Sequence, residues 1–132
     1  MPKKKTEQVA EAVQSPFKTD EDFASLYANN VIFEKSVWDL KMIFGQLDQS
    51  QQQFVVEQHT AITVSWSHAK LMAYLLAVNV ALHEIDNGLV TIPPSVIPSV
   101  PDPTAPEVAG NKRAVLVMEY LRSLHKRYFG ES

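Results

Sequence analysis

The sequence predicts an α+β fold: an antiparallel sheet of three or more strands packed on one long helix, then a proline-rich arm and a C-terminal amphipathic helix. Three observations lead to this prediction. Apolar residues alternate with a period of two up to about residue 66, and a helical period follows from residue 68 to 87. Six of the eight prolines then fall between residues 89 and 110, where they exclude long helices.

The first two strands are expected at residues 29–37 and 38–45, and the few residues between them predict a hairpin. Asp39 is expected to brace the turn. Gly45 is expected to adopt a positive φ, which glycine tolerates. The polar segment 46–53, which contains four glutamines among its residues after Leu47, is expected to be an exposed loop.

A long third strand is expected at residues 54–66, with a bend or bulge near Gln58 and His59. Either Ser65 or Ser67 then caps a helix that runs from about residue 68 to 87, because a serine hydroxyl can accept a hydrogen bond from a free amide at a helix start. Gly88 is expected to end this helix. Residues 23–88 therefore form the predicted core domain.

The long helix is apolar nearly all round its surface, so it must be covered on more than one side. A three-stranded sheet covers one side, and a second helix or a second subunit must cover the other. We expect a homo-oligomer, most simply a symmetric dimer. The expected interface is one stripe at helical spacing, formed by Leu71, Leu75, Val78 and Leu82.

The ends of the chain are expected to differ from this core. Residues 1–22 are mostly polar and are predicted to be disordered. Residues 89–110 are predicted to form a semi-rigid linker, and residues 111–132 an amphipathic helix capped by Asn111 and ended by Gly130. An isolated helix of this length is only marginally stable, so we expect it to dock on a neighbouring subunit or another protein. The expected contacts are Tyr120, Leu121, Leu124 and Tyr128.

Composition excludes several classes of function. The 132 residues carry a net charge of -3 and no cysteine, which argues against a generic nucleic-acid binder and excludes disulfides and thiolate zinc sites. The basic N-terminus is not followed by an apolar run, and no segment reaches the roughly 20 apolar residues of a membrane span. The expected location is the cytoplasm.

No pattern of catalytic or metal-binding residues is apparent. The four histidines, His59, His68, His83 and His125, show no metal-ligand spacing. Ser65, Ser67 and His68 are neighbours, but a serine in a helix cap explains them better than a catalytic triad. We therefore expect no catalytic residue, no metal and no cofactor.

An ordered series of short motifs resembles a known family. The motifs are Tyr27-Ala28-Asn29, Trp38-Asp39, Phe44-Gly45 and Ser67-His68-Ala69-Lys70. They resemble a family of small bacterial and archaeal proteins that is described only as a domain of unknown function, over about residues 27–92. The chain departs from the family where Trp66-Ser67 replaces Ser-Pro, and where residues 83–88 replace a Tyr-Glu ending. The resemblance implies a strand-strand-strand-helix unit and no activity.

The leading functional prediction is a non-enzymatic, homo-oligomeric module for protein interaction or scaffolding, which binds itself and another protein. One alternative is a chaperone-like binder of extended polypeptide. Another is a binder of nucleic acid or a membrane surface through the basic C-terminal helix, which carries Lys112, Arg113, Arg122, Lys126 and Arg127. The chaperone is the runner-up and rests on fold-level analogy alone. Binding of nucleic acid or membrane is not favoured, because basic residues on a docked helix also simply face water.

Overall fold

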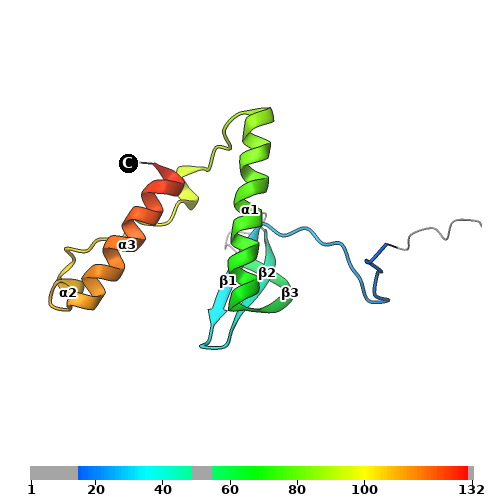
Figure 1. Cartoon of the computed structure of the whole chain (residues 1–132), viewed down its shortest axis with the longest axis horizontal. Helices are drawn as coiled ribbons and strands as arrows, with labels where there is room; N and C mark the ends of the chain where they lie inside the picture. The colour runs from blue at the N-terminus through cyan, green and yellow to red at the C-terminus, as the bar shows by residue number, and fades with distance from the viewer. Residues whose placement is uncertain (1–14, 49–54, 131–132) are drawn as a thin grey trace, which may run out of the picture. The chain divides into compact units, whose positions relative to one another are not determined.

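The computed structural model describes residues 15–48 and 55–130. It shows a three-stranded antiparallel sheet packed against a long helix, followed by a C-terminal helix (Figure 1), which confirms the predicted fold class. The chain forms two compact units, residues 1–74 and 75–132, whose boundary falls within the long helix. The elements are β1 (Asn30–Lys35), β2 (Asp39–Asp48), β3 (Val55–Ser65), α1 (Trp66–Asn87), the 3-10 turn η1 (Pro94–Val96), α2 (Pro106–Ala109) and α3 (Lys112–Phe129).

The strands follow one another across the sheet in the order β1, β2, β3, so β2 is central and the other two are edges. Because paired residues in antiparallel strands point to the same side, the register defines one apolar face. Met42 lies at its centre, opposite Phe33 on β1 and Ile62 on β3, and is only 7% exposed. Val31, Leu40, Phe44, Thr60 and Val64 lie on the same face, and Lys35 adds a charge at its end, opposite Leu40.

The pairing of β2 and β3 contains a bulge at the predicted place. Phe44 lies opposite Thr60 but Gly45 lies opposite Gln58, so His59 is an extra residue on β3. Gly45 is needed at this point for a reason that differs from the prediction. In the part of the chain that is described, only Gly88 and Gly130 have a positive φ, so the positive φ predicted for Gly45 is wrong.

Gly45 instead allows the bulged backbone of β3 to come close. A Cβ atom at this position would lie 2.7 Å from the carbonyl oxygen of Glu57 and 2.8 Å from Cγ1 of Val56. Both distances are shorter than van der Waals contact. The absent side chain is therefore what permits the register of β2 and β3.

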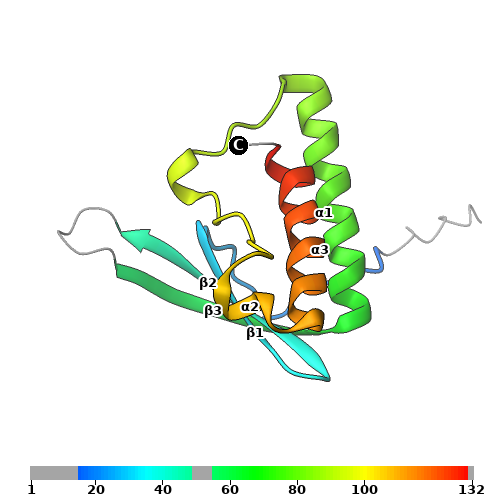
Figure 2. The same cartoon turned by 90° about the vertical axis from the view of Figure 1, so that its left-hand side faces the viewer.

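The second strand is longer than predicted. Residues 46–48, which were expected to lie in an exposed loop, belong to β2 and pair with residues 55–57 (Figure 2). The prediction was wrong here because ladder hydrogen bonds use the backbone, so a polar segment can extend a strand once its partner is in register. The rest of the predicted loop and Phe54 lie outside the described residues.

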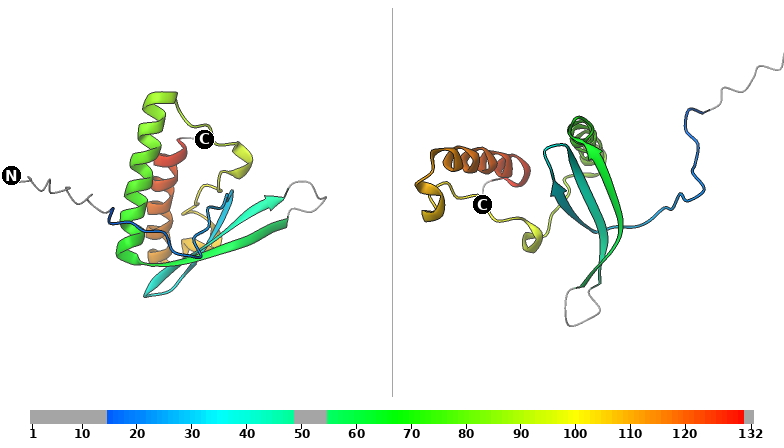
Figure 3. Two further views of the ribbon diagram at one scale, coloured as in Figure 1. Left: turned by 90° about the vertical axis from the view of Figure 1, so that its right-hand side faces the viewer. Right: turned by 90° about the horizontal axis from the view of Figure 1, so that it is seen from below.

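The helix α1 begins directly after β3 (Figure 3). Ser65 is its cap, because its hydroxyl oxygen accepts a hydrogen bond from the amide of His68 at 3.3 Å. At the other end, Gly88 has a φ of 85° and its amide donates to the carbonyl of Glu84 at 2.9 Å. This left-handed residue after the last turn ends the helix as predicted.

The unit of residues 75–132 also contains the proline-rich segment and α3. The side chain of Asn111 accepts hydrogen bonds from the amides of Arg113 and Ala114, and Gly130, with a φ of 79°, follows the last turn. Both predicted ends of this helix are confirmed. The proline-rich segment holds η1 and α2, and Val108 of α2 is buried where α2 contacts α3. Residues 15–22 form no helix or strand, and the remainder of the predicted disordered segment lies outside the described residues.

Candidate interaction surfaces

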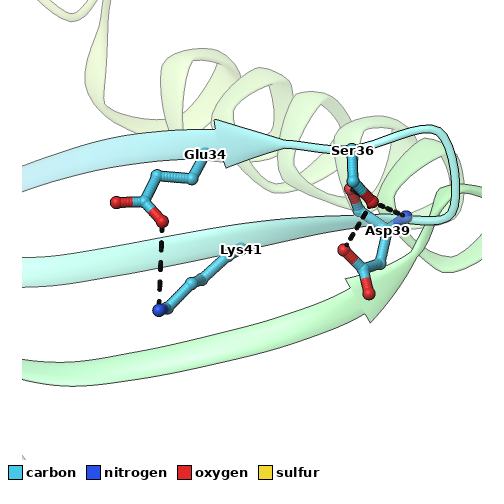
Figure 4. A network of polar contacts seen from close by, with 4 residues as sticks. All are labelled: Glu34, Ser36, Asp39 and Lys41. Carbon is cyan, nitrogen blue, oxygen red and sulfur yellow. Dashed lines mark hydrogen bonds and ion pairs between the residues drawn. The ribbon is translucent and has the colours of Figure 1, made fainter.

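A compact set of hydrogen bonds holds the turn between β1 and β2 (Figure 4). The hydroxyl oxygen of Ser36 accepts from the amides of Trp38 and Asp39, each at 3.1 Å, and the hydroxyl donates to Oδ1 of Asp39 at 2.9 Å. The amide of Ser36 also donates to the carbonyl of Asp39 at 3.0 Å. Asp39 therefore braces the turn, as predicted. The bracing fixes a two-residue tip, Val37 and Trp38, and the Trp38 side chain is 83% exposed.

Two further contacts steady this hairpin. The indole Nε1 of Trp66 donates to the carbonyl of Ser36 at 3.0 Å, which ties the first residue of α1 to the turn. Behind the turn, Nζ of Lys41 lies 3.9 Å from a carboxylate oxygen of Glu34. Both side chains of that pair are largely exposed, so it contributes well under about 1 kcal/mol to stability. The hydrogen-bonded turn therefore does most of the local positioning.

A second polar cluster gathers around the bulge. Nε2 of His59 lies 3.0 Å from the carbonyl oxygen of Tyr27 and donates to it, since a carbonyl can only accept. The side-chain oxygen of Asn29 accepts from the amide of Leu47 at 2.7 Å, and the backbone amide of Asn29 donates to the carbonyl of Gly45 at 3.1 Å. The Tyr-Ala-Asn motif and Gly45 thus have structural roles, because together they fix the approach of the chain to β1.

The four residues predicted as an interface all lie on α1. Their spacing of four, three and four residues places them on one side of the helix. Leu71, Leu75 and Leu82 are 51%, 47% and 56% exposed, and Val78 is partly exposed. The structure therefore presents an apolar stripe that is only half covered.

The four residues predicted as binding contacts lie on α3. Tyr120 and Tyr128 are largely exposed, whereas Leu121 and Leu124 are more covered. They follow the helical spacing, with Leu121, Leu124 and Tyr128 on one side and Tyr120 beside them. The binding role of these four side chains is a prediction.

The proline-rich segment is bonded to α3. Nε2 of His125 donates to the carbonyl of Pro98 at 2.7 Å, and the His125 ring lies 4.9 Å from that of Phe129. Nearby, the Thr104 hydroxyl and amide donate to the Asp102 carboxylate and, with a weaker attraction from Arg122, lower the pKa of Asp102. The His125 hydrogen bond and the Arg122 attraction therefore connect the proline-rich segment to α3.

Sequence reasoning missed Ser36, Trp66 and His125 as positioning residues. Ser36 carried a usable signal, since serine at the first position of a tight turn bonds the backbone that follows it. Trp66 and His125 bond carbonyls 30 and 27 residues away along the chain, and no local pattern marks such contacts.

The two described segments contain no group of three or more histidine, aspartate or glutamate residues placed to hold a metal ion. Ser65, considered above as a nucleophile, uses its hydroxyl in the cap of α1 and lies 3.2 Å from that of Ser67. A hollow in the surface is lined by Gln46, Leu47, Asp48 and Glu57, of which the last two carry carboxylates. No helix in residues 15–48 and 55–130 is long and apolar enough to cross a membrane.

The sequence of the chain matches a known protein family. Residues 1–92 match the model described as Protein of unknown function (DUF3467), which covers more than half of the chain. The chain belongs to this family. The DUF3467 region includes the whole sheet and α1, and it starts earlier than the resemblance over residues 27–92 predicted. The segment that holds η1, α2 and α3 follows it. No curated protein and no solved structure matches the chain.

Proposed function

We propose that this DUF3467 protein is a non-enzymatic interaction module that associates with copies of itself through the apolar stripe of α1. The observation that supports the proposal is the half-exposed row of leucines, Leu71, Leu75 and Leu82, on one side of a 22-residue helix. Contiguous apolar surface of this kind marks interaction sites on soluble proteins. In the proposed scaffold, Tyr120, Leu121, Leu124 and Tyr128 of α3 engage the neighbouring subunit or another protein.

The free energy of such an association depends on how much exposed leucine surface becomes buried. Burying a whole leucine side chain contributes about 1.5–3 kcal/mol, so covering the exposed half of each of these three contributes about 1 kcal/mol. A symmetric dimer repeats each contact, which gives about 6 kcal/mol from these leucines alone. A micromolar dissociation constant needs about 8 kcal/mol in net free energy. The stripe therefore supplies much of the driving force but needs further contacts around it.

The substitution Leu75→Asp tests the proposal. Leu75 lies in the middle of the stripe, and a buried unpaired carboxylate costs several kcal/mol. We expect the variant to be monomeric or unfolded, as measured by light scattering and circular dichroism. Ala77→Asp is the matched control, because two residues along a helix place it on the opposite side of α1. If Leu75→Asp associates and melts like the wild type, the stripe is not an interface.

A further inference from the structure

The two edge strands of the sheet differ in how they are protected from pairing with another chain. Among the described residues β3 pairs with β2 alone, so it is an edge of the sheet (Figure 3, right). Edge strands expose unpaired amides and carbonyls, and most proteins protect them with charges, prolines or short length. The edge strand β1 follows that rule, because it has six residues and ends in Glu34 and Lys35. The other edge does not follow it.

The unprotected part of β3 is the segment between its bulge and the cap of α1. It consists of Thr60, Ala61, Ile62, Thr63 and Val64, which include no charge, proline or glycine. Four of the five are β-branched, the side-chain type that best fits a pleated strand. This segment therefore has the composition of a strand that pairs on both sides.

The hydrogen-bonding pattern shows which backbone groups are free. Ser36 donates to the carbonyl of Asp39, so these two form a hydrogen-bonded pair, and such pairs alternate along an antiparallel ladder. Counting from Asp39, every second residue of β2 bonds toward β1, and those between bond toward β3. Thr60, Ile62 and Val64 therefore bond to β2. The amides and carbonyls of Ala61 and Thr63 point to the free edge.

We propose that β3 of one copy pairs antiparallel with β3 of a second copy, about a two-fold axis at Ile62. This inference rests on the proposed self-association and specifies its geometry. Ile62 is the midpoint of the segment between His59 and Ser65, so this register uses every uncharged position and avoids the bulge. Ala61 then bonds Thr63 of the second copy in both directions, and the two sheets join into one of six strands with a continuous apolar face.

A second copy fits this edge better than an unrelated peptide because the segment is self-complementary. In the proposed register Ile62 meets Ile62 of the second copy and Thr60 meets its Val64, and such β-branched pairs stabilise sheets. The charge pattern agrees with this arrangement. The antiparallel orientation carries Glu57 toward the N-terminus of the other α1, which has a partial positive charge and no acidic residue in its first turn.

Cross-linking tests the register directly, because the chain has no cysteine of its own. Residues on the two-fold axis form a non-hydrogen-bonded pair with Cα atoms about 4.5 Å apart, which lies within the range that a disulfide spans. We expect Ile62→Cys in the full chain to form a covalent dimer under mild oxidation. Ile32→Cys is the matched control, since Ile32 is 43% exposed on the opposite edge strand and Ile62 is 47% exposed.

A second variant tests the hydrogen bonds without a cross-link. Thr63→Pro removes an amide that points to the free edge, where proline is tolerated within a single sheet. We expect circular dichroism to stay unchanged and the dimer dissociation constant to rise about tenfold, because two symmetric hydrogen bonds are lost.

The outcomes separate this inference from the proposed function. If the wild type is a dimer but Ile62→Cys forms no more cross-link than Ile32→Cys, the β3 pairing is wrong and the self-association stands. The β3 pairing is also wrong if Thr63→Pro dimerises like the wild type. If the wild type is a monomer throughout, the self-association is wrong and the β3 pairing is wrong with it.

Discussion

Replacing Gly45 by alanine tests how the sheet is built. The added Cβ would lie 2.7 Å from the Glu57 carbonyl oxygen and 2.8 Å from Val56 Cγ1, and it would also lie 3.1 Å from the Cα atom of Gln58. Two of these three atoms belong to the backbone of the partner strand, so a side-chain rotation cannot relieve the overlap. Either the β2–β3 register shifts near the bulge or the strands separate locally.

Overpacking of this kind costs about 1–3 kcal/mol in the free energy of unfolding. For a chain of this size, about 2 kcal/mol lowers the melting temperature by about 5–10 °C. Thermal unfolding followed by circular dichroism measures the change. The control is Gly110→Ala, because Gly110 has a φ of -82° and a Cβ there would meet nothing within 4 Å. Equal melting temperatures for the two variants would refute the role assigned to Gly45.

Two further predictions concern the unit of residues 75–132. The lowered pKa of Asp102 means that its ionised form stabilises the folded chain above the ordinary value of 3.8, and that this stabilisation is lost as the pH falls through the folded-state pKa. Asp102→Asn should therefore flatten the loss of melting temperature between about pH 5 and pH 3, and an unchanged pH profile would contradict the assignment. A chain that ends after Val90 should keep the circular dichroism of the sheet and α1 but associate more weakly or lose partner proteins in pull-down. If it retains both, α3 is not an interaction element.

Much of the fold could be predicted because its signals are local. The alternation of side chains predicts each strand, and the caps Ser65 and Asn111 and the left-handed Gly88 mark helix ends closely. The bulge at His59 was also predicted, since the alternation of β3 breaks there. In each case the cause and the consequence lie within one turn or one strand.

Features that join distant segments could not be predicted. The role of Gly45 depends on how closely β3 approaches, and the extension of β2 into residues 46–48 depends on the register of its partner. The bond from Trp66 to Ser36 likewise has no signature in the sequence.

The same contrast between local and distant causes applies to the candidate surfaces. Helical spacing predicted that Leu71, Leu75, Val78 and Leu82 lie on one side of a helix, and that Tyr120 and Leu121 lie on another helix near Leu124 and Tyr128. What covers these surfaces depends on a second surface, in this chain or in another, and the pattern of one helix does not specify it. Backbone pairing at the edge of β3 adds a surface that side-chain patterns did not indicate, because it depends on the order of strands in the sheet.

Light scattering of the full-length wild type across micromolar concentrations tests the central claim most directly. Self-association through α1 and β3 predicts a molar mass that rises with concentration toward twice the 14.8 kDa of one chain, or toward a higher multiple. A constant mass of one chain at every concentration would contradict it.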